Sequence, residues 1–464
     1  MFLPTESPDR AEIPPSQEWQ AALDAFKGDP QGVRLGEAFD PSPKNIESRV
    51  VRRQLSNDIR TALLPKKTRG GRVVANLALH WGDEKSLTNR DVACSFAGAM
   101  LMRGTKKRSR ADIKDAFEKL NASVSVNGEG ASIEVRRENL AATLRLVAEV
   151  LREPAFSKEE FDEMKRAALT GAESQRTDPS ALASLQLARH LSLYPKGHPN
   201  YTPDVDERID WLRAATLEDA TACYRELFGA TGAEFVAVGE FDPAEVARLV
   251  EELFGAWKLP RPYTRVASRH FDRPAAANEV ITPDKANAVL RAGLNLKLRD
   301  DHPDFPALVL ANYLLGGSST ARMPGRVREK EGLSYSTFTS FNASAFDEAG
   351  AFRIGAIFAP QNRSRVESAI REELERAVRE GFDAEEIAAG KKALLEARRM
   401  ARTQDRALAS RLSSYLFTKR TFAWDIEFEA KIAALTPAQV NAAVKSHFDP
   451  GKLSMVSAGD FKKN

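Results

Sequence analysis

The strongest constraint on the fold is an internal duplication in the sequence. Three residues of the first half return in the second half with the same displacement of 220 positions: Thr216, Phe228 and Gly239 correspond to Thr436, Phe448 and Gly459. In the first copy, Thr216 and Asp219 have the spacing of a helix start, and the apolar run before Gly239 is typical of a strand. Chance hardly produces three matches in one register, so we expect two halves with the same fold.

The repeat divides the chain into segments. A stretch rich in Pro and Arg, residues 258–276, separates the two copies and has the composition of a linker. The N-terminal residues contain several Pro and one short amphipathic segment, Trp19–Phe26, which predicts an arm that docks on the body. We expect an extended N-terminal arm at 1–45, a first half at 46–259, a linker at 260–276 and a second half at 277–464.

The pattern within the first half indicates the fold class. Strand-like patterns over 59–64 and 72–80 predict strands, and Asn127-Gly128 between two alternating runs predicts a hairpin. Helical patterns follow, in groups and not in strict alternation with strands. This order predicts an α+β fold, in which helices cover one face of each mostly antiparallel sheet.

Composition excludes several classes of function. The 464 residues are 42% apolar and 29% charged, which is typical of a globular protein, and the net charge of +3 does not indicate a nucleic-acid partner. Basic clusters at 66–69 and 106–110 are interpreted as solvated loops, with binding of acidic partners as the weaker alternative. No apolar run reaches the length of a membrane span, so we expect no membrane partner. The N-terminus lacks a signal pattern. The compartment stays open: the bacterial periplasm is favoured if a signal peptide has been removed, and the cytoplasm otherwise.

The two cysteines lie far apart in the sequence. Cys94 and Cys223 form no Cys-x-x-Cys pattern, so they indicate neither a zinc ribbon nor a disulfide framework. We interpret Cys94 as a buried apolar thiol.

A helix over about 90–103 carries the most informative positions. Ser95 and Ala99 are one turn apart on the same face, and Gly98 lies beside them. With the following Gly104-Thr105, the segment resembles the inverted zinc helix of the pitrilysin-type (M16) metallopeptidases, in which His-x-x-Glu-His precedes an apolar run and Gly-Thr. In that family the two His bind zinc and the Glu activates water. Ser95, Gly98 and Ala99 offer neither imidazole nor carboxylate, so we expect no metal in this chain and no activity of the chain alone.

A second stretch resembles the other half of the same family. The segment that includes Gly316-Gly317 and continues from Arg328 through Gly332 to Tyr335 resembles its Gly-Gly and Arg-Glu-x-x-Gly-Leu-x-Tyr pattern. In those peptidases an Arg and a Tyr at this spacing reach across a clam shell to the zinc site of the opposite half. The resemblance therefore implies that Arg328 and Tyr335 act catalytically in trans. A guanidinium can hold a substrate carbonyl and a phenol can donate to an oxyanion. The alternative is that Arg328 pairs with a neighbouring Glu and Tyr335 packs.

Two further groups of residues are weaker candidates for metal ligands. The resemblance places Glu173 near the family's third zinc ligand, but a solvated helix carboxylate is preferred because its two His partners are absent. The sequence His80-Trp-Gly-Asp83-Glu84 could form a metal cluster, but the other histidines show no ligand spacing with it.

The resemblance, which covers about residue 46 to the C-terminus, implies an M16/LuxS-like fold and a role without zinc. The leading hypothesis is a non-catalytic subunit of a heteromeric M16 zinc peptidase, which supplies Arg328 and Tyr335 to a zinc-bearing partner that hydrolyses a peptide substrate. The zinc cofactor is then expected in the partner subunit alone. The alternative is an inactive structural relative, like the core subunits of the respiratory cytochrome complex. An enzyme with chemistry of its own has no supporting constellation of residues.

Overall fold

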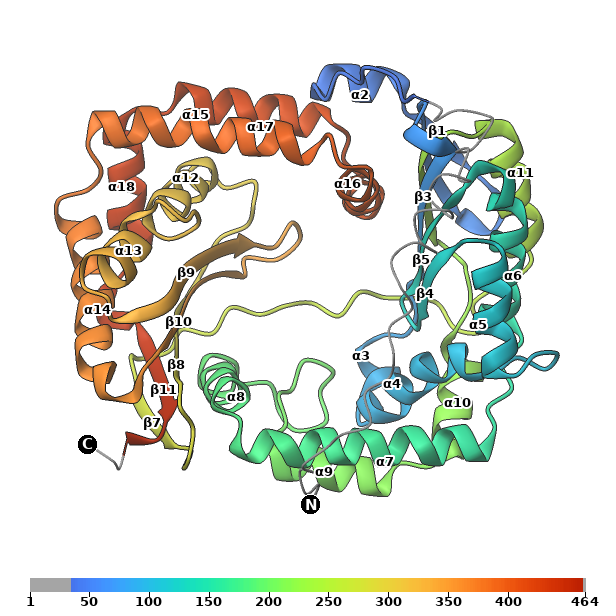
Figure 1. The fold of residues 1–464 in the computed structure, drawn as a ribbon, viewed down its shortest axis with the longest axis horizontal. Helices are drawn as coiled ribbons and strands as arrows, with labels where there is room; N and C mark the ends of the chain where they lie inside the picture. The colour runs from blue at the N-terminus through green and yellow to red at the C-terminus, as the bar shows by residue number, and fades with distance from the viewer. Residues whose placement is uncertain (1–34, 462–464) are drawn as a thin grey trace, which may run out of the picture.

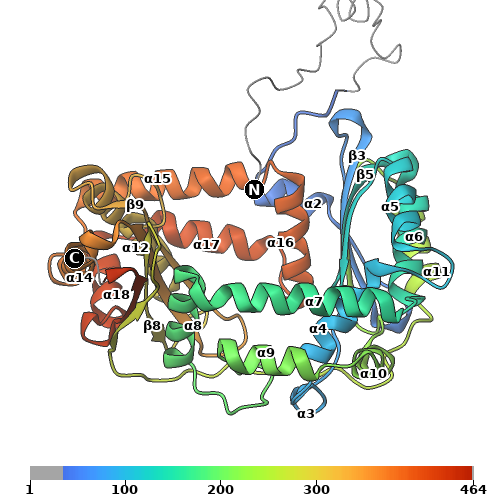
Figure 2. The ribbon, with the colours of Figure 1, turned by 60° about the horizontal axis from the view of Figure 1, so that its bottom comes forward.

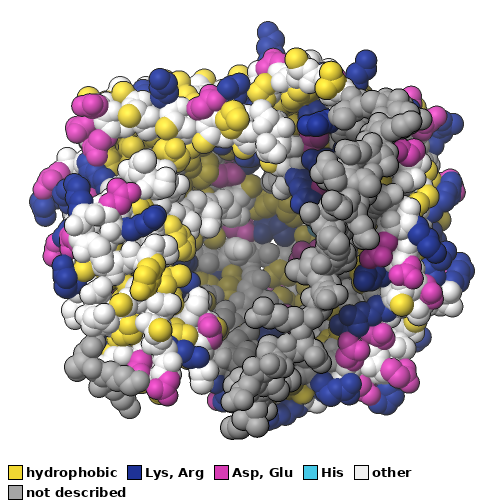
Figure 3. Space-filling model, in the orientation of Figure 1, with side chains coloured by type: hydrophobic (Ala, Val, Ile, Leu, Met, Phe, Trp, Pro, Cys, Tyr) yellow, Lys and Arg dark blue, Asp and Glu magenta, His cyan; other side chains and the backbone are white. Residues whose placement is uncertain are grey.

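The computed structural model describes residues 35–461 and folds them into two α+β halves that face each other (Figure 1). The segment Trp19–Phe26 and most of the expected arm lie outside the described residues. One half contains a sheet of six strands and the other a sheet of five. The space-filling view is hollowed between the halves (Figure 3). The predicted α+β clam-shell fold is confirmed.

The first half is built on the six-stranded sheet, whose strand order is β1-β2-β6-β3-β5-β4. Its strands are β1 (Val51–Gln54), β2 (Arg60–Pro65), β3 (Arg72–Ala78), β4 (Ser123–Asn127), β5 (Gly130–Arg136) and β6 (Glu234–Gly239). Only β2 and β6 pair in parallel. The expected hairpin is formed by β4 and β5. Its turn lies at Gly128-Glu129, one residue later than predicted, because Asn127 pairs with Gly130 in the ladder.

Most helices of this half cover one face of this sheet or extend from its end, while the first of them packs on the opposite face through Ile46. The helices of this half are α2 (Pro43–Arg49), α3 (Glu84–Leu87), α4 (Asp91–Met100), α5 (Arg110–Lys119), α6 (Leu140–Arg152), α7 (Lys158–Ser174), α8 (Pro179–Leu191), α9 (Val205–Ala214), α10 (Leu217–Leu227) and α11 (Pro243–Phe254). Val73, Ile133 and Phe235 point from the sheet into a core that includes Val147 of α6 and Val250 of α11. This core fixes α4 relative to the β4–β5 hairpin.

The second half repeats the plan on the five-stranded sheet, whose order is β7-β11-β8-β10-β9. Its strands are β7 (Ala277–Ile281), β8 (Ala288–Leu296), β9 (Ser334–Ala343), β10 (Gly350–Phe358) and β11 (Ser454–Gly459). Its helices are α12 (Phe305–Leu315), α13 (Arg322–Pro324), the π-helical segment η6 (Gly325–Lys330), α14 (Arg363–Arg379), α15 (Ala384–Ala401), α16 (Asp405–Thr418), α17 (Ala423–Ala434) and α18 (Pro437–His447). Residues 258–276, all of them described, form neither helix nor strand. None of the described helices is long and apolar enough to cross a membrane.

The duplication read from the sequence is present in the structure down to single hydrogen bonds. Thr216 caps α10 and Thr436 caps α18, in each case by accepting from the backbone N–H three residues later. A lysine repeats as well. Lys165 of α7 donates to the carbonyls that close α9, and Lys391 of α15 donates to the carbonyls that close α17.

Each half completes the other by exchanging a helix. The α8 residues Ala183, Leu187 and Leu191 pack on Val289 and Val456 of the five-stranded sheet. In return, the buried α16 residues Leu408, Leu412 and Tyr415 pack on the six-stranded sheet. Figure 2 shows the long helices α7 and α15 running between the two sheets toward the exchanged helices. The exchange fixes how the inner faces of the two sheets oppose each other.

Candidate functional site

The degenerate zinc positions lie on α4, which continues as a short 3-10 turn to Arg103 and so agrees with the predicted helix. Ser95 and Ala99 are both exposed on the helix, one turn apart, whereas Gly98 is buried. None of the three side chains can bind zinc or accept a proton at neutral pH. The residues present therefore do not fit a zinc ion.

The backbone of Gly128 occupies the space that a side chain at position 98 would need. A Cβ atom built on Gly98 would lie 2.6 Å from the Gly128 nitrogen and 2.9 Å from the Gly128 Cα, in the turn of the β4–β5 hairpin. The turn is itself fixed, because the Trp81 indole donates to the Gly128 carbonyl at 2.6 Å. Packed backbone atoms move only at a cost, so no side chain fits at position 98 in this arrangement. The motif has lost its ligands and also the space for its central carboxylate.

A disulfide joins Cys94, beside the exposed Ser95, to Cys223 on α10. The two Cα atoms are 5.4 Å apart, although 129 positions separate them in the sequence. The expectation of no disulfide and of a free buried thiol at Cys94 is therefore wrong. Spacing along the chain carries no information here, because the packing of α10 against α4 brings the residues together. The bond fixes the degenerate helix to its neighbour.

Glu173, at the end of α7, forms ion pairs with two arginines. Its carboxylate contacts Arg176 at 2.6 Å and Arg213 at 3.4 Å and is 43% exposed. This is the solvated helix carboxylate preferred from the sequence. His80 also has a structural partner, since it contacts the fully buried Glu234, which Arg60 contacts as well. Asp83 caps α3 by accepting from Ser86, so His80, Asp83 and Glu84 form no metal cluster.

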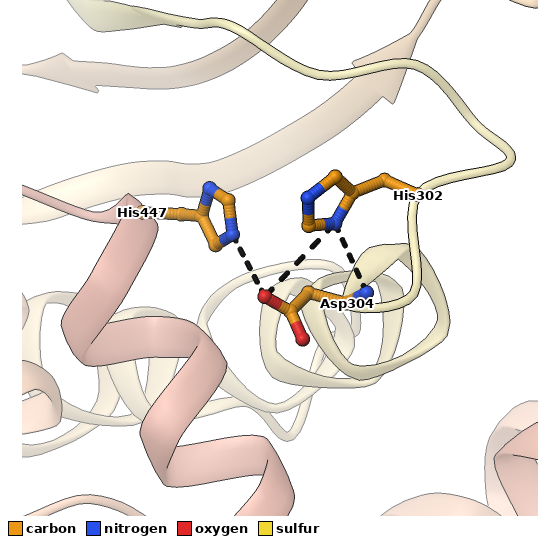
Figure 4. A group of neighbouring side chains, drawn as sticks. All are labelled: His302, Asp304 and His447. Carbon is orange, nitrogen blue, oxygen red and sulfur yellow. Dashed lines mark hydrogen bonds and ion pairs between the residues drawn. The ribbon is translucent and has the colours of Figure 1, made fainter.

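One other group among residues 35–461 brings together three potential metal ligands: His302, Asp304 and His447 (Figure 4). His447 Nε2 lies 2.9 Å from Asp304 Oδ2, and His302 Nδ1 accepts from the Asp304 backbone N–H at 3.1 Å. Apart from the short spacing of His302 and Asp304, no pattern in the sequence indicates this group. These contacts join the start of α12 to the end of α18, so helix packing accounts for them without a metal.

The predicted helper residues lie where η6 meets β9. Arg328 is on the last turn of η6, and Gly332 follows with φ +62°, a left-handed conformation that glycine adopts without strain. Gly332 therefore permits the turn from η6 into β9. Tyr335 is the extra residue of a β-bulge, because Ser334 and Ser336 pair with consecutive residues of β10. A bulge re-aims the side chain that it carries.

Neither helper residue is engaged within residues 35–461. Arg328 is exposed and forms no ion pair there, because Glu331 is held by Arg326 at 2.8 Å. Tyr335 is 67% exposed, and its hydroxyl has no hydrogen-bond partner in the described part of the chain. The alternative, in which Arg328 pairs with a neighbouring Glu and Tyr335 packs, is not the arrangement found.

Comparison with known proteins agrees with this geometry. Two family models match: the insulinase model of peptidase family M16 over residues 93–202, and the peptidase M16 inactive-domain model over residues 214–394. An uncharacterized zinc protease of Streptomyces coelicolor is 25% identical over 380 residues, which cover 79% of this chain and 80% of that protein. A non-peptidase homolog of Helicobacter pylori is 20% identical over 398 residues, covering 84% and 89% of the two chains. The crystal structure of an M16 inactive domain from Pseudomonas fluorescens matches with a TM-score of 0.77 and 20% identity, over 88% of this chain and 97% of that one.

The chain belongs to the M16 peptidase family, as a member that lacks the His-x-x-Glu-His motif and keeps the Arg and Tyr of the second half. The resemblance inferred from Gly104-Thr105 and from the segment around Gly332 is thereby confirmed. The fold defines the class, and the closed position at Gly98 places the chain among its inactive members.

Proposed function

We propose that this chain is a non-catalytic subunit of a heteromeric M16 zinc peptidase and supplies Arg328 and Tyr335 to a zinc-bearing partner. One observation carries the proposal: both side chains are exposed and without partners in residues 35–461, while the chain's own zinc position is closed by Gly128. Exposed groups held at a defined turn and without internal partners are available to a substrate.

The chemistry of the pair suits peptide hydrolysis. The planar guanidinium of Arg328 can hold a substrate carbonyl in a fixed orientation, and the phenol of Tyr335 can donate to the oxyanion of a tetrahedral intermediate. The partner would supply the metal and the general base, and this chain would supply binding and charge stabilisation. The disulfide between Cys94 and Cys223 supports assignment of the complex to an oxidising compartment such as the periplasm.

A structural role is the second candidate, because the closure at Gly98 and the adjacent disulfide suit a scaffold as well as a helper subunit. A scaffold has no use for an unpaired Arg328 beside an exposed Tyr335, and this difference separates the two proposals by experiment.

The test of assembly is co-expression with an M16 chain that carries an intact His-x-x-Glu-His motif. Size-exclusion chromatography should give one complex with an interface well above the size of a crystal contact. The proposal fails if the chains elute separately at micromolar concentration and mixing leaves the partner's activity unchanged.

A further inference from the structure

A cavity of about 700 Å³ lies on one face of the five-stranded sheet. This face is turned away from α12, α14 and α18, whose arrangement Figure 1 shows. Its walls come from α8, from linker residues 268–271 and from β8, β9 and β10. A volume of this size is typical of sites for small molecules and short peptide segments. The cavity lies apart from Gly98 and from the turn that carries Arg328.

The lining is cationic. It contains Arg269, Arg291 and Arg353, and none of its residues, all of them in the described part of the chain, is Asp or Glu. Apolar side chains from α8 and from β9 complete the wall, among them Leu187 and the 47% exposed Phe338. Positive charge beside an apolar surface is the lining that an anionic group on a partly apolar ligand requires.

Two of these arginines are partly buried and have no carboxylate partner. Arg353 donates to the carbonyls of Leu294 and Phe352 and to Asn295 Oδ1, and all three acceptors are neutral. Arg291 donates to the hydroxyls of Ser180 and Ser184 on α8. Asp178 at the start of α8 acts on Arg291 through space, but no ion pair forms between them.

Arg398 and Arg402, which are also poorly exposed, show the contrasting arrangement with carboxylate partners. Arg398 contacts Asp425 and Glu429, and Arg402 contacts Glu429. Burial without a counter-ion disfavours a charge, and it lowers the pKa of Arg353 to about 10. An anionic ligand would remove this cost, because its charge would take the place of the missing acid.

The sheet is shaped to hold the two guanidinium groups. In the ladder between β8 and β10, Arg291 lies opposite Gly355 and Arg353 lies opposite Gly293, so both side chains are on one face. A Cβ built on Gly293 would lie 2.6 Å from Arg353 Cδ, and one built on Gly355 would lie 3.1 Å from Arg291 Nη1. The two glycines therefore provide the space in which the arginines lie across the sheet.

An unsatisfied ring nitrogen lies in the same wall. His270 Nδ1 is buried and has no hydrogen-bond partner among residues 35–461. A buried polar atom without a partner is costly, and a ligand in the cavity could satisfy it.

We propose that this cavity binds a carboxylate group of a peptide, held by Arg353 and Arg291 while neighbouring peptide side chains contact Phe338 and Leu187. The assignment of a peptide as the carrier rests on the proposed function, whereas the affinity for a carboxylate rests on the cavity alone. The carboxylate belongs either to the C-terminus of the peptide or to an Asp or Glu side chain, and the experiment separates these sources.

The test uses the full chain without a partner and a decapeptide, rich in Ala and Leu, with an uncharged BODIPY dye at its N-terminus, one internal Glu and a free C-terminus. Fluorescence anisotropy gives Kd for this peptide, for its C-terminal amide, for its Glu→Gln form and for the doubly neutral form. Loss of a hydrogen bond to a charged group should weaken binding about tenfold or more. If the site binds the C-terminal carboxylate, the C-terminal amide should show this loss of affinity. If it binds the side-chain carboxylate, the Glu→Gln peptide should show it. The doubly neutral peptide must show the loss in either case.

Substitutions locate the site. Arg353→Gln and Arg291→Gln should each weaken binding of the charged peptide about tenfold and leave the doubly neutral peptide unaffected. Arg365→Gln is the matched control, since Arg365 is exposed on α14, which packs on the opposite face of the sheet, and it should change Kd less than about twofold.

Equal Kd values for all four peptides, or no binding of any of them up to about 1 mM, would overturn the inference without any variant having to fold. This outcome would not contradict the proposed function if the complex with the zinc-bearing partner still needed Tyr335 for hydrolysis. Conversely, charge-dependent binding by a chain that forms no complex would uphold the site and remove the helper role.

Discussion

Gly98 and Gly128 are in direct backbone contact, and this contact closes the place where an active M16 helix carries its carboxylate. A Cβ at Gly98 would meet the Gly128 nitrogen at 2.6 Å, well inside any normal contact distance. The loss of the zinc motif is therefore built into the packing of α4 on the β4–β5 hairpin. Restoring the motif residues alone would not restore the site.

The first prediction concerns this contact. Gly98→Ala should destabilise the chain by about 1–3 kcal/mol, because one methyl group forces the hairpin backbone to shift. Ala99→His is the matched control on the exposed face and should change the free energy of unfolding by less than about 0.5 kcal/mol. Urea unfolding of the three chains measures both values. If Gly98→Ala and the unsubstituted chain were equally stable, the hairpin turn would not be packed tightly against Gly98 of α4.

The second prediction concerns metal. The chain with Ser95→His, Gly98→Glu and Ala99→His should retain no stoichiometric zinc after dialysis, because the central carboxylate has no space and Glu173 is held by arginines. The measurement is metal analysis of the dialysed protein. Its control carries His447→Ala in addition, which removes the His302–Asp304–His447 group. About one tightly bound zinc that persists in this control would show that the α4 site had been rebuilt.

The third prediction concerns the disulfide. Breaking the bond between Cys94 and Cys223 with dithiothreitol should lower the free energy of unfolding by about 2–5 kcal/mol, since the bond closes a long loop. The chain with Cys94→Ser and Cys223→Ser should be less stable from the start and should not respond to dithiothreitol. Thiol titration of the unfolded, unreduced protein provides the check, and two free thiols per chain would contradict the pairing.

The fourth prediction concerns acid stability and Glu207 in the first turn of α9. Burial alone would raise the pKa of Glu207, but hydrogen bonds from Lys196, the Asp204 N–H, Tyr201 and Arg189 outweigh it and lower the pKa from 4.5 to about 2. A lowered pKa stabilises the folded chain above the unfolded value, and this stabilisation is lost as the pH falls from 4.5 toward 2.

Glu207→Gln should therefore cost roughly 1–3 kcal/mol at neutral pH and almost nothing near pH 2. Unfolding in urea at a series of pH values, for both chains, measures the difference. If the difference stayed constant across this range, the ionised carboxylate of Glu207 would not be the source of the stabilisation.

Local signals made much of the fold predictable from the sequence. Thr216 and Thr436 begin equivalent helices because a hydroxyl at a helix start has a defined local partner, and the alternation over 72–80 gave β3. The exchange of α8 and α16 could not be predicted, because their apolar faces specify burial and not the sheet that they cover.

The features of the candidate sites likewise fall into two groups: those that a local sequence pattern indicates and those that arise from packing between distant segments. A local pattern indicated the degenerate motif positions Ser95, Gly98 and Ala99, and another indicated Arg328 and Tyr335, whose catalytic role stays a prediction. The Cys94–Cys223 bond, the contact of Gly98 with Gly128 and the lack of an acid beside Arg353 arise between distant segments. No spacing along the chain encodes such relationships, because helix and sheet packing creates them.

The central claim is that Tyr335 and Arg328 act on the substrate of a partner's zinc site. The most direct measurement is kcat for peptide hydrolysis by the purified complex with Tyr335→Phe, beside Tyr313→Phe as a control that removes a hydroxyl from α12. We expect Tyr335→Phe to assemble normally, to leave the partner's zinc content unchanged and to lower kcat by roughly 10²–10³, the loss typical of one oxyanion donor. Arg328→Ala should lower kcat at least as much, and Arg328→Lys should restore little. Near-normal kcat/KM in assembled complexes that carry Tyr335→Phe or Arg328→Ala would contradict the account and make the chain a scaffold.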